Sequence, residues 1–109
     1  MKAIAIGGVP ATGKTTLVKT ILNVMKPKSM FKYGLLRGYL ANDCSILGIY
    51  KKDEVFAGTD KLSMAVQKDF EAYINKNRTH ILFEGDRLFT KNNLLTLSEH
   101  YQLKIILLQ

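Results

Sequence analysis

The sequence is poor in the features that mark secreted and membrane-spanning proteins. Its single cysteine, Cys44, excludes an intramolecular disulfide and suits a reducing compartment. The apolar run at residues 3–6 is too short for a secretory signal, and no apolar stretch approaches membrane-spanning length. We therefore expect a soluble protein of the cytoplasm.

Acidic residues are missing from the first 42 positions, which hold seven lysines and arginines. Residues 43–109 hold nine basic and nine acidic residues, so the whole net charge of +7 belongs to the N-terminal part. The positive electrostatic field of these residues would attract polyphosphate or nucleic acid. The alternative is a solvated surface, because Lys26 and Lys28 sit where a helix C-terminus favours cations. No DNA- or RNA-binding motif accompanies the charge, so a nucleic-acid partner is not favoured.

Length and composition suit one compact unit. At 109 residues and 47% hydrophobic composition, the chain is long enough to bury a real core, and we expect a single domain over residues 1–109. Neither histidine has partners at metal-ligand spacing, and a lone cysteine cannot build a zinc site.

One motif stands out near the N-terminus. Residues 8–15, Gly-Val-Pro-Ala-Thr-Gly-Lys-Thr, fit the phosphate-binding P-loop (Walker A) pattern. An apolar run of strand length precedes the motif and a run with helical spacing follows it, which is the setting in which the motif carries meaning. The alternative is a glycine-rich turn that only begins a helix.

The chemistry of a phosphate site explains these residue types. Gly8 and Gly13 allow backbone angles that a side chain would forbid, so successive N–H groups can face phosphate oxygens. Lys14 would reach the β- and γ-phosphates, and the Thr15 hydroxyl would ligate Mg²⁺. The residues predicted to bind the nucleotide are Gly8, Val9, Pro10, Ala11, Thr12, Gly13, Lys14, Thr15 and Thr16.

Hydrophobic spacing predicts the elements that follow. Apolar residues from Leu17 to Met25 predict a helix that Pro27 ends. Asn42-Asp43 has turn chemistry and predicts a hairpin. The remaining predicted elements are strands at 34–40, 45–50 and 55–57, a helix over about 61–76, a strand at 80–83, a short helix from Lys91 and a buried strand at 103–108.

The predicted strand directions indicate which segments lie near the P-loop. In open α/β sheets, ligands bind at the carboxyl ends of the parallel strands, where the P-loop also lies. Suppose that the strands at 34–40 and 55–57 run parallel to the strand before the P-loop and that the strand at 45–50 runs opposite to it. The segment Gly58-Thr59-Asp60 then lies at the end of the sheet that carries the P-loop. Thr59 and Asp60 would then contact the substrate. The alternative is that one of them only caps the following helix.

A second chemical signal ends the strand at 80–83, which runs into Glu84-Gly85-Asp86-Arg87. P-loop enzymes hold Mg²⁺ or a positioning water with an acid at the end of such a strand, and Glu84 is predicted for that role. Asp86 would accept a proton from an acceptor hydroxyl. Arg87 would stabilise phosphoryl charge or bind an anionic substrate. The alternative is a simple turn in which Asp86 and Arg87 pair in solvent.

Three segments together carry a family resemblance: residues 8–16, residues 58–63 (Gly-Thr-Asp-Lys-Leu-Ser) and residues 83–89 (Phe-Glu-Gly-Asp-Arg-Leu-Phe). They resemble small P-loop kinase-like proteins of the nucleoside/nucleotide kinase superfamily, which includes phage-encoded members. The resemblance covers most of the chain, although only the P-loop is specific by itself.

The resemblance implies an α/β fold, a three-layer sandwich of the P-loop NTPase type with a mostly parallel sheet and an inserted antiparallel meander. It also implies an Mg²⁺-dependent phosphotransferase with ATP as donor. The acceptor would be a small hydroxyl or phosphate compound, such as a nucleoside or nucleotide. Two alternatives stay open: an enzyme acting on nucleic-acid ends, and a non-catalytic nucleotide-binding module.

The end of the sequence departs from that family. Such kinases continue past this last strand into an arginine-bearing lid, a helix and a further strand, whereas the sequence here stops at Gln109. A lid supplies charge stabilisation and excludes water. We therefore expect a C-terminally truncated form without the lid and the last strand, which transfers phosphate poorly, or a partner that completes the site.

Overall fold

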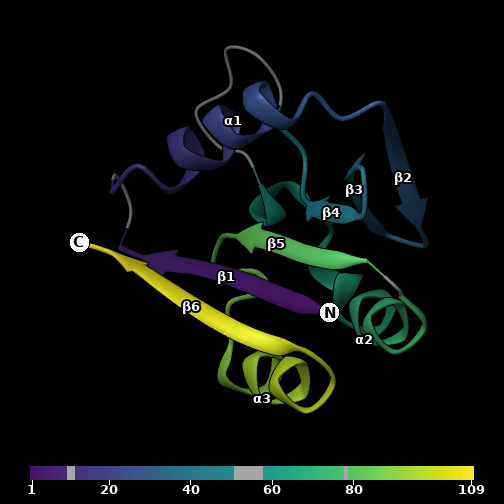
Figure 1. The fold of residues 1–109 in the computed structure, drawn as a ribbon. Coiled ribbons are helices and arrows are strands. Elements are labelled where there is room, and N and C mark those ends of the chain that lie inside the picture. Colours follow the sequence, from purple (N-terminus) through teal and green to yellow (C-terminus); the bar gives the residue numbers. More distant parts are fainter. Residues whose placement is uncertain (10–11, 51–57, 78) are drawn as a thin grey trace.

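The computed structural model describes residues 1–9, 12–50, 58–77 and 79–109. Within them the chain forms a mixed six-stranded sheet in the order β2-β3-β4-β5-β1-β6, with helices on both faces (Figure 1). The α/β class predicted from the sequence is confirmed. No helix in this part of the chain is long and apolar enough to cross a membrane. The elements are β1 (Lys2–Gly8), α1 (Lys14–Met25), β2 (Ser29–Tyr33), β3 (Leu36–Ala41), β4 (Cys44–Leu47), the 3₁₀ turns η1 (Thr59–Lys61) and η2 (Met64–Val66), α2 (Gln67–Lys76), β5 (His80–Glu84), α3 (Lys91–His100) and β6 (Gln102–Leu108).

The central strands of the sheet are parallel. β4, β5, β1 and β6 run in one direction, and β2, β3 and β4 form an antiparallel meander at one edge. β1 lies between β5 and β6, with Ile6 beside Glu84 on one side and Gly8 beside Leu108 on the other. The carboxyl ends of the neighbouring strands β1 and β5 therefore lie side by side, at the end of the sheet where α1 begins.

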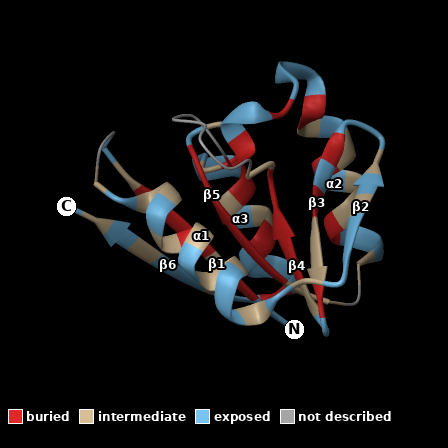
Figure 2. Cartoon of the chain, turned by 90° about the horizontal axis from the view of Figure 1, so that it is seen from above, coloured by how far each residue is buried: buried red, intermediate tan, exposed pale blue. Residues whose placement is uncertain are grey.

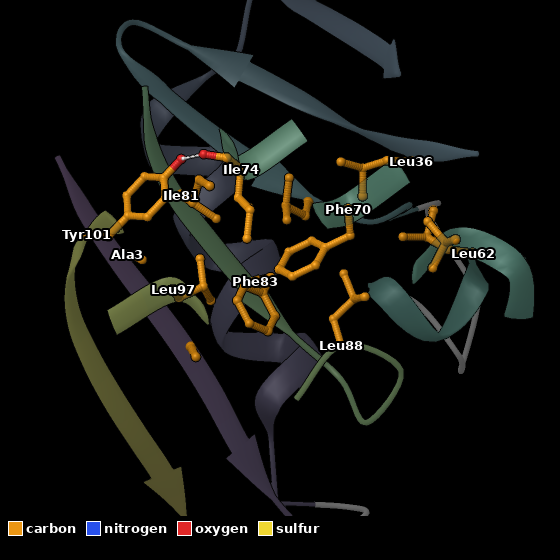
Figure 3. Close-up of a cluster of buried hydrophobic side chains, with 13 residues drawn as sticks. Ala3, Leu36, Leu62, Phe70, Ile74, Ile81, Phe83, Leu88, Leu97 and Tyr101 are labelled. Atoms are coloured by element: carbon orange, nitrogen blue, oxygen red, sulfur yellow. Dashed lines mark hydrogen bonds between the residues drawn. The ribbon is translucent and has the colours of Figure 1, made fainter. Parts of the chain in front are cut away.

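The sheet separates two hydrophobic cores, because successive side chains of a strand point to opposite faces. One core lies beneath α2 and α3, where Phe70 of α2 meets Phe83 of β5 with ring centroids 6.0 Å apart (Figure 3). The other lies beneath α1, where Val18 packs with Ile6 and Leu82. Figure 2 shows buried residues along the inner strands and exposed ones along β2 and β6.

The meander differs from the predicted one in its first strand and its directions. β2 precedes it and was not predicted, so β3 runs opposite to β5 and β4 runs parallel to it, the reverse of the prediction for 34–40 and 45–50. The Asn42-Asp43 turn is confirmed between β3 and β4. The predicted strand at 55–57 lies outside the described residues.

Contacts with α2, far along the sequence, explain why β2 was missed. Phe31 of β2 stacks on Tyr73, with ring centroids 5.1 Å apart. The Asp69 carboxylate accepts a hydrogen bond of 2.8 Å from the backbone N–H of Leu35, in the turn between β2 and β3. The neighbouring Gly34 has φ 60°. None of these contacts can be inferred from the spacing of apolar residues along the sequence, so β2 was not predicted.

The helix predicted over about 61–76 begins later than expected, at Gln67. Leu62 has extended backbone angles, and the Ser63 hydroxyl accepts a hydrogen bond from Ala65 N–H, so η1 and η2 form two short turns before α2. The predicted apolar face is nevertheless correct, because Leu62, Val66, Phe70 and Ile74 are all buried and Tyr73 packs against them.

The final strand is confirmed as a strand, but the prediction that it is buried is wrong. β6 lies at the edge of the sheet, and its side chains Ile105 and Leu107 are 47% and 61% exposed. A continuous apolar run is typical of a strand covered on both faces. Here the run belongs to a strand that has a neighbour on one side only among the described residues.

We expect Phe70→Ala to lower the free energy of unfolding by about 3–5 kcal/mol, because it removes a fully buried ring between α2 and β5. Urea unfolding followed by circular dichroism measures the change. Val24→Ala, at a side chain that is 77% exposed, is the control and should change stability by less than about 0.5 kcal/mol. Equal losses in the two variants would contradict the assigned core.

Candidate functional site

The loop between β1 and α1 has the backbone geometry predicted for a phosphate loop at both of its ends. Gly8 and Gly13 have φ 144° and 89°, a region that residues with side chains rarely adopt. The Thr12 hydroxyl donates a 2.8 Å hydrogen bond to the carbonyl of Val9 and so closes the loop on itself. Pro10 and Ala11, which were also predicted to bind the nucleotide, lie outside the described residues.

The first turn of α1 has features that favour a nearby anion. Its N-cap is Gly13, which has no side chain to accept from the helix N–H groups, and the turn contains no acidic residue. The exposed Thr16 lies in the same turn. Unpaired N–H groups and the positive end of the helix dipole both favour negative charge at this position.

Lys14 brings the loop together with the end of β5. Its ammonium group donates to the carbonyl of Gly8 and lies 3.9 Å from a carboxylate oxygen of Asp86. The Lys14 side chain is only 11% exposed, whereas that of Asp86 is 77% exposed. Lys14 and Asp86, which were both predicted to be catalytic, therefore face each other although they are 72 positions apart in the sequence. Lys14 is held inside the loop, and Asp86 is open to solvent.

Glu84, at the end of β5, lies beneath the start of α1 with a residue exposure of only 2%. One of its carboxylate oxygens accepts hydrogen bonds from the Thr15 hydroxyl at 3.2 Å and from the Tyr50 hydroxyl at 3.0 Å. The two residues predicted to ligate Mg²⁺, Thr15 and Glu84, are therefore in direct contact.

Burial governs the protonation of this cluster. It raises the pKa of Glu84 above its ordinary value, and the negative charge of Asp60 adds to the rise. Hydrogen bonds from Tyr50 and Thr15, together with the charge of Lys14, act in the opposite direction. Burial and the neighbouring Glu84 also raise the pKa of Tyr50, so its hydroxyl remains a donor.

Tyr50 and Tyr39 are part of the site, although the sequence analysis did not select them. The Tyr39 hydroxyl donates to the carbonyl of Tyr50 at 2.9 Å and accepts from its N–H at 3.0 Å, which fixes Tyr50 beside the carboxylate. Gly58 leaves room for this contact, because a Cβ there would lie 2.8 Å from the Tyr50 hydroxyl and would also clash with Glu84. In the sequence, Gly58 is the sole local indication of this close contact, and a glycine does not show which residues lie beside it.

Thr59 and Asp60 reach the carboxyl end of β5, as the sequence analysis predicted, but they do so as anchors. The Thr59 hydroxyl donates to the carbonyl of Glu84 at 2.8 Å, and the residue is fully buried, so its side chain is closed to a substrate. Asp60 accepts from the backbone N–H of Arg87 at 2.9 Å. Neither residue caps a helix, because the N-cap of η1 is Gly58.

Arg87 is held by Asp60. Its guanidinium lies 3.4 Å from the carbonyl of Asp60, while Asp86 faces Lys14, so the simple turn with an Asp86–Arg87 pair is not the arrangement observed. The Nε atom of Arg87 is buried and has no hydrogen-bond partner among the described residues. Buried donors are usually paired, so this atom is a candidate contact for an anionic ligand.

The donor atoms of Thr15 and Glu84 fit Mg²⁺. Both offer oxygen, the ligand that Mg²⁺ prefers, and this ion commonly takes one or two protein ligands while phosphate and water complete its shell. The described part of the chain contains no group of three or more His, Cys, Asp or Glu residues that could hold a metal without such help. The site therefore suits a metal that arrives with a polyphosphate.

The chain matches no protein-family model, no curated protein and no solved structure. The functional argument therefore depends on the motif and on the contacts described above.

Glu84→Gln should flatten the pH dependence of stability. Because folding raises the pKa of Glu84, the folded chain binds this proton more tightly than the unfolded chain does. Stability from this group is thus complete below the ordinary pKa of 4.5 and is lost as the pH rises through the raised pKa. We expect the wild-type protein to lose stability over that range in the presence of a chelator, and Glu84→Gln to lose less.

Urea unfolding at a series of pH values above and below 4.5 measures this effect. Glu99→Gln, which changes an exposed carboxylate on α3, serves as the control and should keep the wild-type slope. An identical slope in wild type and Glu84→Gln would show that the carboxylate does not titrate as described.

Proposed function

We propose that the chain is an Mg²⁺-dependent phosphotransferase of the P-loop NTPase type, a kinase that uses ATP and resembles the nucleoside/nucleotide kinases. One observation carries the proposal: the N-terminus of α1 meets the end of β5, where Lys14, Thr15, Glu84 and Asp86 gather. Glycine loop, lysine, hydroxyl and carboxylate are the groups that phosphoryl transfer requires.

The residues divide into those that would bind the nucleotide and those that would hold the metal. The N–H groups of the loop and of the first turn of α1 would cradle the phosphates, and Lys14 would leave the Gly8 carbonyl to reach them. Thr15 and Glu84 would hold Mg²⁺, which supplies charge neutralisation on the phosphate oxygens. Tyr50 would hold the Glu84 carboxylate in place beside Thr15 through its hydrogen bond to one carboxylate oxygen.

The transfer step assigns a role to Asp86. The acceptor hydroxyl would attack the γ-phosphorus, the bond to the leaving β-phosphate oxygen would break, and ADP would depart. The hydroxyl proton would pass to the Asp86 carboxylate and then to solvent, which this exposed side chain can reach. Lys14, 3.9 Å away, would set the carboxylate beside the transferring group.

Arg87 and Asp60 support a small polar acceptor. The Nε of Arg87, which has no hydrogen-bond partner within residues 1–9, 12–50, 58–77 and 79–109, would suit a phosphate or another anionic group, and Asp60 would hold the arginine in position. A nucleoside or nucleotide combines hydroxyl and phosphate groups of the required kind.

A nucleic-acid-end kinase or NTPase is the second candidate, and the charge of residues 1–42 favours it. These residues carry seven cations and no acid, and they include the phosphate loop itself. A polynucleotide acceptor would give an affinity that falls steeply with added salt. A small acceptor would give a much weaker dependence.

Nucleotide binding is tested by thermal melting with Mg·ATP. At a hundred times the dissociation constant the ligand stabilises the fold by about 2.7 kcal/mol. For a domain of this size, that corresponds to a rise on the order of 10 °C. We expect Lys14→Ala to lose most of the rise and Lys28→Ala, an exposed cation outside the loop, to keep it. A full rise in Lys14→Ala, or none in the wild type at millimolar nucleotide, would contradict the proposed site.

Catalysis is tested separately with Asp86→Asn. We expect this variant to keep the thermal rise and to transfer phosphate to nucleosides or nucleotides about 10²–10⁴-fold more slowly, because it cannot accept the proton. Radiolabelled ATP with a panel of small acceptors and of oligonucleotide ends measures the product. Binding by the wild type with no product from any acceptor would instead indicate a non-catalytic nucleotide-binding module.

A further inference from the structure

Two cations face each other in the outer part of the antiparallel meander. Lys32 of β2 lies directly opposite Arg37 of β3, and both residues are exposed. Neither makes an ion pair with any residue that the structure describes. Like charges directly opposite each other in a sheet are destabilising, so the fold gains no stability from this pair.

Other cations of the N-terminal part have a structural reason for their positions. Lys26 is the C-cap of α1, where the helix dipole favours a positive charge. Lys14 is held in the loop by the carbonyl of Gly8. Within the described part of the chain, no comparable contact explains Lys32 and Arg37, which lie on strands.

The pair lies on the same face of the sheet as α1. β2 turns Phe31 toward Tyr73 of α2, so the next residue, Lys32, points to the opposite face. Arg37 shares its side of β3 with Tyr39, which packs against the core beneath α1. In Figure 2, seen from above, β2 lies to one side of α1 and is drawn as exposed. The two cations are therefore open to solvent beside α1.

The strand register places the two cations level with Glu84. The Gly48 N–H donates a 2.8 Å hydrogen bond to the carbonyl of Arg37. The parallel register of β4 and β5, continued to its end, sets Gly48 level with Glu84. Neighbouring strands are about 4.8 Å apart, so the backbone of Arg37 lies about 10 Å from that of Glu84, and the backbone of Lys32 about 14 Å. The cations and the buried carboxylate therefore share one face and one end of the sheet.

Aromatic rings lie between the cations and the carboxylate. Tyr39 is two residues beyond Arg37 and lies opposite Met30, which is 62% exposed. The ring centroids of Tyr39 and Tyr50 are 6.3 Å apart, and the Tyr50 hydroxyl donates to Glu84. This face thus presents cations on its outer strands and half-buried aromatic rings toward the site.

We propose that this face of β2 and β3 binds a single strand of nucleic acid, with Lys32 and Arg37 on its phosphates and Tyr39 beside a base. Proteins that bind single strands combine a positive surface along the backbone with aromatic rings on which bases stack. Residues 1–42, which include both strands, contain no acid that would repel the phosphates. The sequence contains no nucleic-acid-binding motif, and it is the strand pairing that brings these cations together. The proposal concerns binding alone and does not depend on phosphoryl transfer.

Fluorescence anisotropy with a labelled oligothymidylate of about 12 nucleotides tests the proposal. At about 50 mM salt, we expect Lys32→Ala/Arg37→Ala to raise the dissociation constant at least about tenfold. The slope of log affinity against log salt should fall by about 1.4, because each of two lost phosphate contacts contributes about 0.7. The control Lys68→Ala/Lys91→Ala removes two exposed cations from α2 and α3, on the other face of the sheet, and should keep both values.

A charge reversal separates binding from folding. Lys32→Glu sets opposite charges across the strand pair, so its melting temperature should equal or exceed that of the wild type. Its dissociation constant should nevertheless rise further than that of Lys32→Ala. Met30→Glu, on the same face, should also weaken binding, whereas Met64→Glu, at a position in η2 that is 83% exposed, should not.

Three results would overturn the proposal. The first is a wild type that does not bind the oligonucleotide, and the second is equal affinity in wild type and Lys32→Ala/Arg37→Ala. The third is binding at least as tight to a duplex of the same length or to vesicles containing phosphatidylserine, because that would indicate a general attraction to anionic surfaces. Weaker binding to the duplex and the vesicles supports a site for a single strand.

Discussion

One buried carboxylate organises the end of the sheet at which β1 and β5 finish. Glu84 accepts hydrogen bonds from Thr15 at the start of α1 and from Tyr50 in the segment after β4, while its backbone carbonyl accepts from Thr59 in η1. A buried carboxyl group is costly without such partners, so the hydrogen bonds from Thr15 and Tyr50 offset part of the cost of burying Glu84 at the end of β5. The same hydrogen bonds fix three segments that are distant in sequence around the loop of Gly8–Thr15.

If the site binds a metal as proposed, this arrangement would link folding to ligand binding through a single group. Burial disfavours the negative charge of Glu84, and nothing in its described surroundings except Lys14 supplies a compensating cation. A divalent ion beside the Thr15 hydroxyl would reverse that balance, because it favours the charged carboxylate. The site is therefore least stable when Glu84 is ionised and no metal ion is beside it. In that state it would bind a metal–polyphosphate complex most readily.

The sequence predicts the parts of this site that are encoded locally. The glycine loop, the helix after it and the acid at the end of β5 each follow from a few neighbouring residues, and the structure brings Lys14, Thr15, Glu84 and Asp86 together. The missed features depend on distant contacts: β2 is held by the stacking of Phe31 on Tyr73, and Tyr50 is positioned by Tyr39. The edge position of β6 was missed for another reason. A run of aliphatic residues predicts a strand but does not say how many neighbours the strand has.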